Sequence, residues 1–314
     1  MAHGKAPGCD GFPMEFYVKF WPVLGVDLVR VFNSSFSSGL LSPSQRRGVI
    51  SLSYKKGDRL DPRNWRPITL LNVDYKIASR AIAARLLKVL HLVVERDQSC
   101  GVPGRFIGEN VSFLRDVVHF CSSTGVPAVI LSLDQEKAFD RVDWGFLRST
   151  LVSMGFGPSF IQWVMLFYSD VQSAVNVNGH ISPFFSLSRG VRQGCPLSPL
   201  LYVLVAEVLA CSIRANPHID GLSLSLVFRL PFLAFLSMLT ILPLLLFLTG
   251  QLMKSLMSMI FMKGVRGQNL IFPSVRASGL VLGMDGRMLQ SPSLGRPLRS
   301  RCLVCFLPPG IWRR

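Results

Sequence analysis

The chain has 314 residues, 49% of them hydrophobic, which suits one large folded domain or two smaller ones. Its net charge of +16 favours a polyanionic partner or an anionic membrane surface, with general basicity as the alternative. The first residues have no apolar core, which excludes a secretory signal at this start, and the seven scattered cysteines are typical of free thiols in a reduced, intracellular protein.

Residues 1–220 have the hydrophobic periodicity of a protein that mixes helices and strands. The periodicity predicts helices at residues 12–36, 74–94, 146–154, 158–168 and 198–214. Strands are predicted at residues 48–54 and 127–133, and at 174–177 and 184–187 around the turn Asn178-Gly179.

The composition changes sharply near Gly221. Residues 1–220 carry 23 basic and 17 acidic residues, a net charge of +6, whereas residues 221–314 carry 11 basic residues and one acid, a net of +10. A folded soluble surface normally mixes both signs. Residues 230–248 are 19 uncharged, Leu- and Phe-rich residues, long enough for a membrane helix but interrupted by Pro231 and Pro243. The pair Cys302 and Cys305 is too small for a zinc site, which needs about four ligands.

A basic turn follows the strand predicted at residues 48–54. Guanidinium groups match phosphate oxygens, and Trp65-Arg66-Pro67 favours a phosphate contact at Arg66. The alternative is a solvated charged tip. The turn places five cations within twelve positions: Lys55, Lys56, Arg59, Arg63 and Arg66.

The apolar run Val129–Leu133 ends in Asp134, and Phe139 follows five residues later. A buried strand that ends in a carboxylate presents it at the edge of the sheet. Polymerases use such carboxylates to hold two divalent ions, so one aspartate is not enough. The alternatives are a helix cap for Asp134 and core packing for Phe139.

A second basic loop, Arg189–Ser198, contains Gln193-Gly194 and opens an apolar helix. Gly194 allows a close backbone approach, and Arg192 is a candidate for a phosphate contact. The alternative is a simple turn before a helix. The Gln193-Gly194 motif is a stronger indication of function because Gln193 lies 59 residues after Asp134.

In this order the segments resemble the core motifs of a reverse transcriptase of a non-LTR (LINE-type) retrotransposon. The stretches 4–16 and 97–105 extend the resemblance, which covers about residues 4–221. It implies an α+β fold with right-hand polymerase fingers at residues 1–75 and a partial palm at 76–221. Residues 222–314 are then an aberrant apolar and basic tail without a native fold.

The resemblance also implies an RNA-directed DNA polymerase, a nucleotidyltransferase that uses an RNA template, a DNA primer, dNTPs and Mg²⁺ in the nucleus or cytoplasm. Asp134 is then the catalytic residue and metal ligand, and Phe139 lies beneath the sugar of the nucleotide and excludes a 2′-hydroxyl. The remaining residues implied are Lys56, Arg66, Gln193 and Gly194 for the nucleotide, and Lys55, Arg59, Arg63 and Arg192 for nucleic acid.

The third palm motif of the family, Tyr/Phe-Ala-Asp-Asp, is missing, and no Asp-Asp pair occurs in the chain. At the expected distance stands Ser237–Leu242, which permits the codons xxT ATG CTG ACG ATA CT. From the last base of the serine codon these bases encode Tyr-Ala-Asp-Asp-Thr. At the same offset, codons permitted for Val265–Ile271 can encode Ser-Gly-Ala-Lys-Leu-Asn, which resembles the next family motif. Two such islands predict a frameshift between Gly221 and Ser237.

These observations predict a reverse transcriptase domain that is inactive as written, in the manner of a pseudogene, because the second carboxylate pair is lost. The alternatives are a nucleic-acid-binding protein without catalysis, a membrane protein anchored by residues 230–248, and a group II intron maturase. A membrane helix loses support if the apolar run is a product of the shifted frame.

Overall fold

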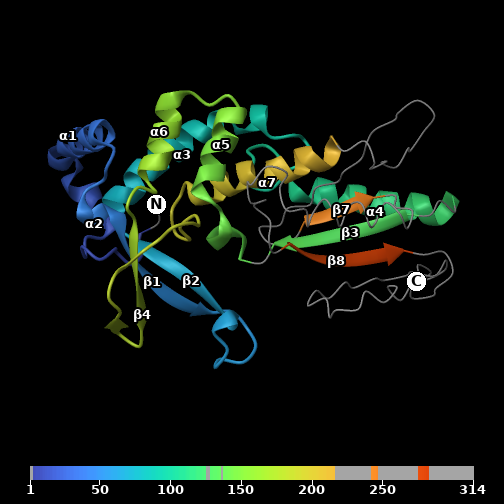
Figure 1. Ribbon diagram of the computed structural model, residues 1–314, viewed down its shortest axis with the longest axis horizontal. Coiled ribbons are helices and arrows are strands. Elements are labelled where there is room, and N and C mark those ends of the chain that lie inside the picture. Colours follow the sequence, from blue (N-terminus) through green and yellow to red (C-terminus); the bar gives the residue numbers. More distant parts are fainter. Residues whose placement is uncertain (1–2, 125–127, 136, 216–241, 247–274, 283–314) are drawn as a thin grey trace. The chain divides into compact units, whose positions relative to one another are not determined.

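The computed structural model describes residues 3–124, 128–135, 137–215, 242–246 and 275–282 (Figure 1). The chain divides into two compact units. The first comprises residues 1–93 and 139–205, and the second comprises residues 94–138 and 206–314. The boundary predicted at residue 75 falls within the first turn of a helix, so the division into fingers and palm stays a prediction.

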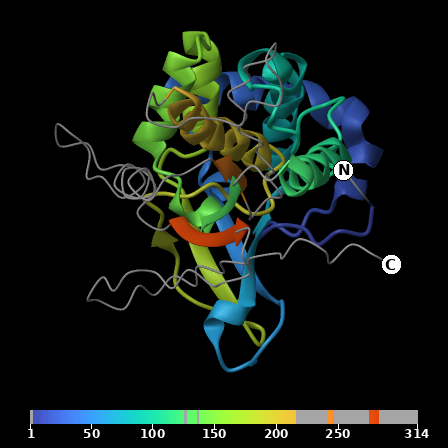
Figure 2. The ribbon, with the colours of Figure 1, turned by 90° about the vertical axis from the view of Figure 1, so that its right-hand side faces the viewer.

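The helices of the first unit pack around α3. In Figures 1 and 2 they gather beyond one end of the sheet, and α3 contacts α1 and α6, while α5 contacts α6. Buried side chains of α3 recur at helical spacing, from Tyr75 through Leu86 to Leu90. Tyr75 meets Phe167 edge to face at 5.1 Å between ring centroids. The helices are α1 (Met14–Ser38), α2 (Pro43–Arg46), α3 (Val73–Val93), α5 (Trp144–Ser153), α6 (Pro158–Leu166) and the first part of α7 (Ser198–Arg214).

The sheet of the first unit has the order β2-β1-β4-β5, with β6 also paired to β4. Strand β1 pairs antiparallel with β2 and parallel with β4, so residues more than 100 positions apart become neighbours. The predicted turn at Asn178-Gly179 is confirmed, with positive φ angles of 51° and 84° that suit a type I′ hairpin. The strands are β1 (Arg47–Tyr54), β2 (Trp65–Leu71), β4 (Gln172–Val177), β5 (His180–Ile181) and β6 (Phe185–Ser186).

The second unit contains α4 (Ile107–Thr124) and a sheet of order β7-β3-β8, antiparallel throughout. Its central strand β3 (Ala128–Gln135) confirms the strand predicted at residues 127–133. The outer strands β7 (Leu242–Leu246) and β8 (Val275–Leu282) come from the tail and were not predicted from the sequence. The rest of residues 222–314 lies outside the described residues, and the absence of a native fold there stays a prediction.

The apolar run at residues 230–248 is described only where it forms β7. Within the described ranges, the helices are all too short or too polar to traverse a lipid bilayer.

Candidate nucleotide and nucleic-acid site

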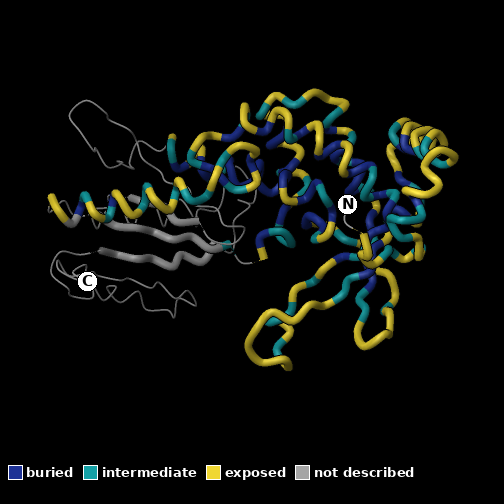
Figure 3. The backbone as a smooth tube through the Cα atoms, turned by 180° about the vertical axis from the view of Figure 1, so that it is seen from behind, coloured by how far each residue is buried: buried dark blue, intermediate teal, exposed yellow. Residues whose placement is uncertain are grey.

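The hairpin of β1 and β2 presents the first group of predicted site residues. Its strands end at the facing pair Tyr54 and Trp65. The loop between them is closed by hydrogen bonds from the Lys55 amide to the Asn64 carbonyl, 2.9 Å, and from the Asn64 side chain to the Asp58 carbonyl, 2.8 Å. In Figure 3 the far end of this hairpin is exposed. All five predicted cations are exposed there: Lys55, Lys56, Arg59, Arg63 and Arg66.

The loop cations differ in their local partners. Arg63 forms an ion pair with Asp61 at 2.9 Å, and its hydrogen bonds hold the pKa of that carboxyl below its usual value. The Arg59 guanidinium lies over the Tyr54 ring, 5.0 Å from its centroid. Arg66 lies within β2, opposite Ser53. Two of the five cations are therefore already engaged within the hairpin.

The segment after Phe139 is joined to the loop Arg189–Ser198 by backbone hydrogen bonds. The amide of Val191 donates to the carbonyl of Phe139, and the amide of Gly190 donates to the carbonyl of Val142, both at 2.7 Å. The indole of Trp144 donates to the Gly190 carbonyl at 2.9 Å. Two motifs that lie about 50 residues apart in the sequence thus form one structure.

Gln193 links this structure to β2. Its side-chain amide donates a hydrogen bond to the Asp140 carboxylate at 3.1 Å. Its backbone carbonyl accepts a hydrogen bond from the backbone amide of Thr69 at 2.7 Å. Gly194 has φ +118°, and a Cβ there would lie 2.5 Å from the Thr69 carbonyl oxygen. The backbone at Gly194 therefore approaches Thr69 of β2, the strand that also carries Arg66, and the predicted contact of Gly194 with template and nucleotide stays a proposal.

Phe139 stacks on Tyr202 of α7, with ring centroids 5.1 Å apart and planes 19° apart. Tyr202 is buried, whereas Phe139 keeps partial exposure. The stack holds one face of Phe139 against the helix, in line with the packing alternative. The predicted role beneath the nucleotide sugar remains a proposal. The sequence analysis did not identify Tyr202, which lies in the helix that follows the loop Arg189–Ser198.

The prediction of a phosphate contact for Arg192 does not fit the structure. The side chain is only 4% exposed. Its guanidinium donates to the carbonyl oxygens of Arg46 and Gln172 and lies over the ring of Tyr75. Because these contacts hold the group inside the first unit, Arg192 supports the loop instead of facing nucleic acid.

Asp134 lies in β3, where its backbone pairs with Arg276 of β8. Its side chain is outside the described residues, so its predicted role stays a proposal. Asp143 caps α5 by accepting the backbone amide hydrogen bond of Phe146 at 2.8 Å. The carboxylate of Asp140 accepts a hydrogen bond from the side chain of Gln193.

Reverse transcriptases as a family use divalent metal ions. Carboxylate oxygens are the ligands that Mg²⁺ prefers, but the described side chains include no group of three or more His, Cys, Asp or Glu placed to hold a metal. A Mg²⁺ site therefore stays a proposal for the described residues. The pair Cys302 and Cys305 lies outside them.

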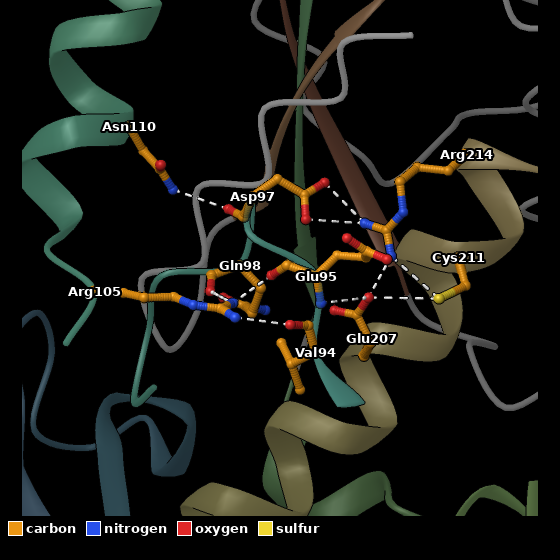
Figure 4. Close-up of polar contacts among 9 residues, drawn as sticks. All are labelled: Val94, Glu95, Asp97, Gln98, Arg105, Asn110, Glu207, Cys211 and Arg214. Carbon is orange, nitrogen blue, oxygen red and sulfur yellow. Dashed lines mark hydrogen bonds and ion pairs between the residues drawn. The ribbon is translucent and has the colours of Figure 1, made fainter. Parts of the chain in front are cut away.

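A polar network in the second unit ties the segment 94–105 to the end of α7 (Figure 4). Arg214 donates to both oxygens of Asp97, at 2.8 and 3.0 Å, and to Glu207. Arg105 donates to the carbonyls of Gln98 and Val94, at 2.7 and 2.8 Å. Asp97 and Arg105, which lie in the stretch 97–105, thus take part in contacts that the sequence alone did not indicate.

Burial shapes the charges of this network. It raises the pKa of Glu207, whose side chain is 1% exposed, and the pKa of Asp97, and in both cases the nearby Arg214 opposes the rise. The two carboxylates in turn raise the pKa of Arg214 against its own burial. The network is therefore a buried ion cluster that binds protons more tightly than free carboxylates do.

The fold of this chain is shared with solved telomerase structures. The structure is similar to telomerase from Candida tropicalis in complex with a TWJ fragment of telomeric RNA, with TM-score 0.50 and 12% identity over 83% of this chain and 44% of that one. Telomerase from Candida albicans, also in complex with a TWJ fragment of telomeric RNA, gives TM-score 0.50 and 12% identity over 87% and 48%. The fold is reverse transcriptase-like.

Sequence comparison identifies the family. Residues 54–229 match the family "Reverse transcriptase (RNA-dependent DNA polymerase)". The chain is 47% identical over 214 residues to the Transposon TX1 uncharacterized 149 kDa protein of Xenopus laevis, covering 68% of this chain and 16% of that protein. It is 29% identical over 172 residues to the Pol polyprotein of the type-1 retrotransposable element R2 of Popillia japonica, covering 54% and 24%. The chain belongs to the reverse transcriptase family and is the reverse transcriptase domain of a LINE-type retrotransposon. It spans less than a quarter of the length of these relatives.

Proposed function

We propose that this chain binds single-stranded nucleic acid through the β1–β2 hairpin and does not polymerise DNA. The observation that supports binding is that all five predicted cations of the β1–β2 hairpin are exposed, four in its loop and Arg66 in β2. Lysine and arginine side chains that neutralise phosphates supply most of non-specific affinity. The net charge of +6 on residues 1–220 adds attraction at longer range.

The template is proposed to be RNA, with a DNA primer and dNTPs as the further partners of the parent enzyme. The name of one relative, the probable RNA-directed DNA polymerase from transposon X-element of Drosophila melanogaster, supports this. Lys56 and Arg66 are proposed to hold the triphosphate, and Gln193 and Gly194 to contact template and nucleotide. The bond between Thr69 and Gln193 supports this assignment, because it fixes the loop against the strand of Arg66.

The lack of catalysis is proposed from the missing carboxylates. Mg²⁺ would neutralise charge on the triphosphate when bound, and Asp134 is the residue proposed to hold it, but one carboxylate does not hold two ions. The sequence Tyr-Ala-Asp-Asp is absent from the chain, and codons permitted for Ser237–Leu242 would encode it in a shifted frame. Sequencing the coding DNA from Gly221 to Ile271 tests the frameshift, and codons that do not encode both shifted motifs would exclude it.

Restoring the frame is expected to restore primer extension as far as the remaining scaffold allows, because it returns the paired aspartates. Asp134→Ala in the restored chain is then expected to abolish extension again. Primer extension by the restored chain that survives Asp134→Ala would contradict the role of Asp134.

The binding is tested by fluorescence anisotropy of labelled single-stranded RNA and DNA at several salt concentrations. We expect log K to fall linearly with log salt, by about 0.7 for each phosphate contact. The double variant Lys55→Ala/Lys56→Ala should weaken binding and flatten the slope. The matched control is Arg80→Ala/Lys88→Ala, which removes the same charge from exposed positions of α3. An equal loss in both variants, or no binding at low salt, would refute the assignment.

A further inference from the structure

Two aromatic rings form a pair where the strands of the basic hairpin meet its loop. Tyr54 ends β1 and Trp65 begins β2, and the two residues face each other across the strands. Their ring centroids are 5.4 Å apart with an interplanar angle of 61°. Tyr54 is 37% exposed and Trp65 is partly exposed. The hairpin therefore shows aromatic surface to solvent beside its cations.

Both rings are fixed by hydrogen bonds to the loop. The Tyr54 hydroxyl donates to the Gly57 carbonyl at 2.5 Å, and the Trp65 indole donates to the Arg59 carbonyl at 2.9 Å. These bonds satisfy the polar edge of each ring and limit its rotation. A ligand that stacks on fixed rings loses less conformational entropy than one that must order them.

The charge around the rings suits a polyanion that also carries flat apolar groups. Lys55 and Lys56 directly follow Tyr54 and are exposed. Leu60, at the tip of the loop, is 90% exposed, so the loop also shows an apolar side chain to solvent. Aromatic rings interleaved with cations are the surface that single-stranded nucleic acid binds, by stacking of bases and contact with phosphates.

We propose that Tyr54 and Trp65 form a stacking platform for an unpaired base of single-stranded nucleic acid, while the loop cations hold the neighbouring phosphates. This inference rests on the proposed nucleic-acid binding and adds a base-dependent part to it. Stacking of this kind is tolerant of sequence and contributes about 5- to 150-fold in affinity for each base.

A cross-strand aromatic pair can also serve only to stabilise its hairpin. That role and the proposed one predict different behaviour. A purely structural pair makes the chain indifferent to the bases of its ligand, because the phosphates alone are recognised. A stacking platform makes affinity depend on bases at constant charge.

The experiment compares two labelled ligands of about 12 nucleotides on the full chain at low salt. One is oligo(dT), and the other is an abasic strand with the same number of phosphates. We expect oligo(dT) to bind at least about 5-fold more tightly. Tyr54→Leu and Trp65→Leu should reduce this ratio toward one, with little change in the affinity for the abasic strand. Tyr54→Phe and Trp65→Phe, which keep a ring, should retain most of it.

The matched control is Phe185→Leu, which removes an aromatic ring that is 44% exposed on β6. It should leave the ratio unchanged. A second measurement needs no variant: 2-aminopurine within the strand should lose fluorescence when the chain binds, since stacking quenches it.

The outcomes separate the two proposals. Equal affinity for both strands, or unchanged 2-aminopurine fluorescence at saturation, would overturn the platform and leave the phosphate binding intact. A ratio that persists in both leucine variants would also overturn it. Binding of neither strand would overturn both proposals.

Discussion

The β1–β2 hairpin and the loop Arg189–Ser198 are both basic turns of the first unit, but their side chains have opposite environments. The loop of the hairpin makes its hydrogen bonds to residues of the hairpin itself, and Arg66 beside it is exposed. The loop bonds to distant segments and buries Arg192 against the carbonyls of Arg46 and Gln172. The same kind of side chain is thus available to a ligand in one region and part of the core in the other.

This difference predicts which substitutions change ligand affinity and which change stability. A residue that contacts only solvent and ligand changes affinity when it is replaced, with little effect on stability. A residue whose backbone or guanidinium joins several segments changes stability first. The hairpin and the loop should therefore separate cleanly in experiments that measure both quantities.

The largest effect on stability is expected for Gly194→Ala. The new Cβ would lie 2.5 Å from the Thr69 carbonyl oxygen at a φ of +118°, so both contact and backbone conformation are unfavourable. We expect the free energy of unfolding to fall by about 2–4 kcal/mol, measured by urea denaturation. The control is Gly155→Ala, with φ +77° and nothing within 4 Å, which should cost about 1–2 kcal/mol. Equal losses would mean that the close approach to Thr69 is unimportant.

The next effect contrasts two arginines directly. Arg192→Ala should lower the free energy of unfolding by about 1–3 kcal/mol, because buried carbonyls lose their donor. It should leave the salt dependence of nucleic-acid binding as it is. Arg66→Ala should keep stability within about 0.5 kcal/mol and reduce the salt slope by about 0.7. Denaturation and anisotropy on both variants check this, and the reverse pattern would break the comparison.

The smallest effect concerns pH and extends the contrast to the ion cluster of the second unit. Burial raises the pKa of Glu207, so the folded chain binds this proton more tightly than the unfolded chain does. The stability linked to it is full below the unfolded pKa and is lost as pH rises through the folded pKa. When the pH is lowered from 7 to 5, the free energy of unfolding of the Glu207→Gln variant should therefore rise less than that of the unsubstituted chain. The control Glu109→Gln, at an exposed position of α4, should match the unsubstituted chain.

The elements that could be predicted from sequence are those with a strong local pattern. The helix predicted at residues 198–214 begins and ends where α7 does, and those predicted at 12–36 and 74–94 lie within two residues of α1 and α3. The segment Ile107–Thr124 was missed, since its polar residues, many of them short, weaken the apolar period. The pairing of β3 with tail strands could not be predicted, because it depends on residues more than 100 positions away.

The candidate site was predictable by residue type but not by environment. The motifs of Phe139 and Gln193 were recognisable because short segments around them carry family-specific residues, and hydrogen bonds join these two segments in the structure. The burial of Arg192 depends on Arg46, 146 positions away, and nothing near Arg192 in the sequence indicates it. Tyr202 was missed for the same reason, since its contact with Phe139 exists only in the folded chain.

The central claim is that this domain binds its template but lacks the carboxylates to act on it. A primer-extension assay tests it directly, with the chain as written, an RNA template, an annealed DNA primer, dNTPs and Mg²⁺, at protein concentrations that saturate binding. The account predicts that the template-primer is fully bound by the protein and that the primer does not lengthen. Robust extension would contradict it, because another carboxylate of the chain would then complete the site with Asp134.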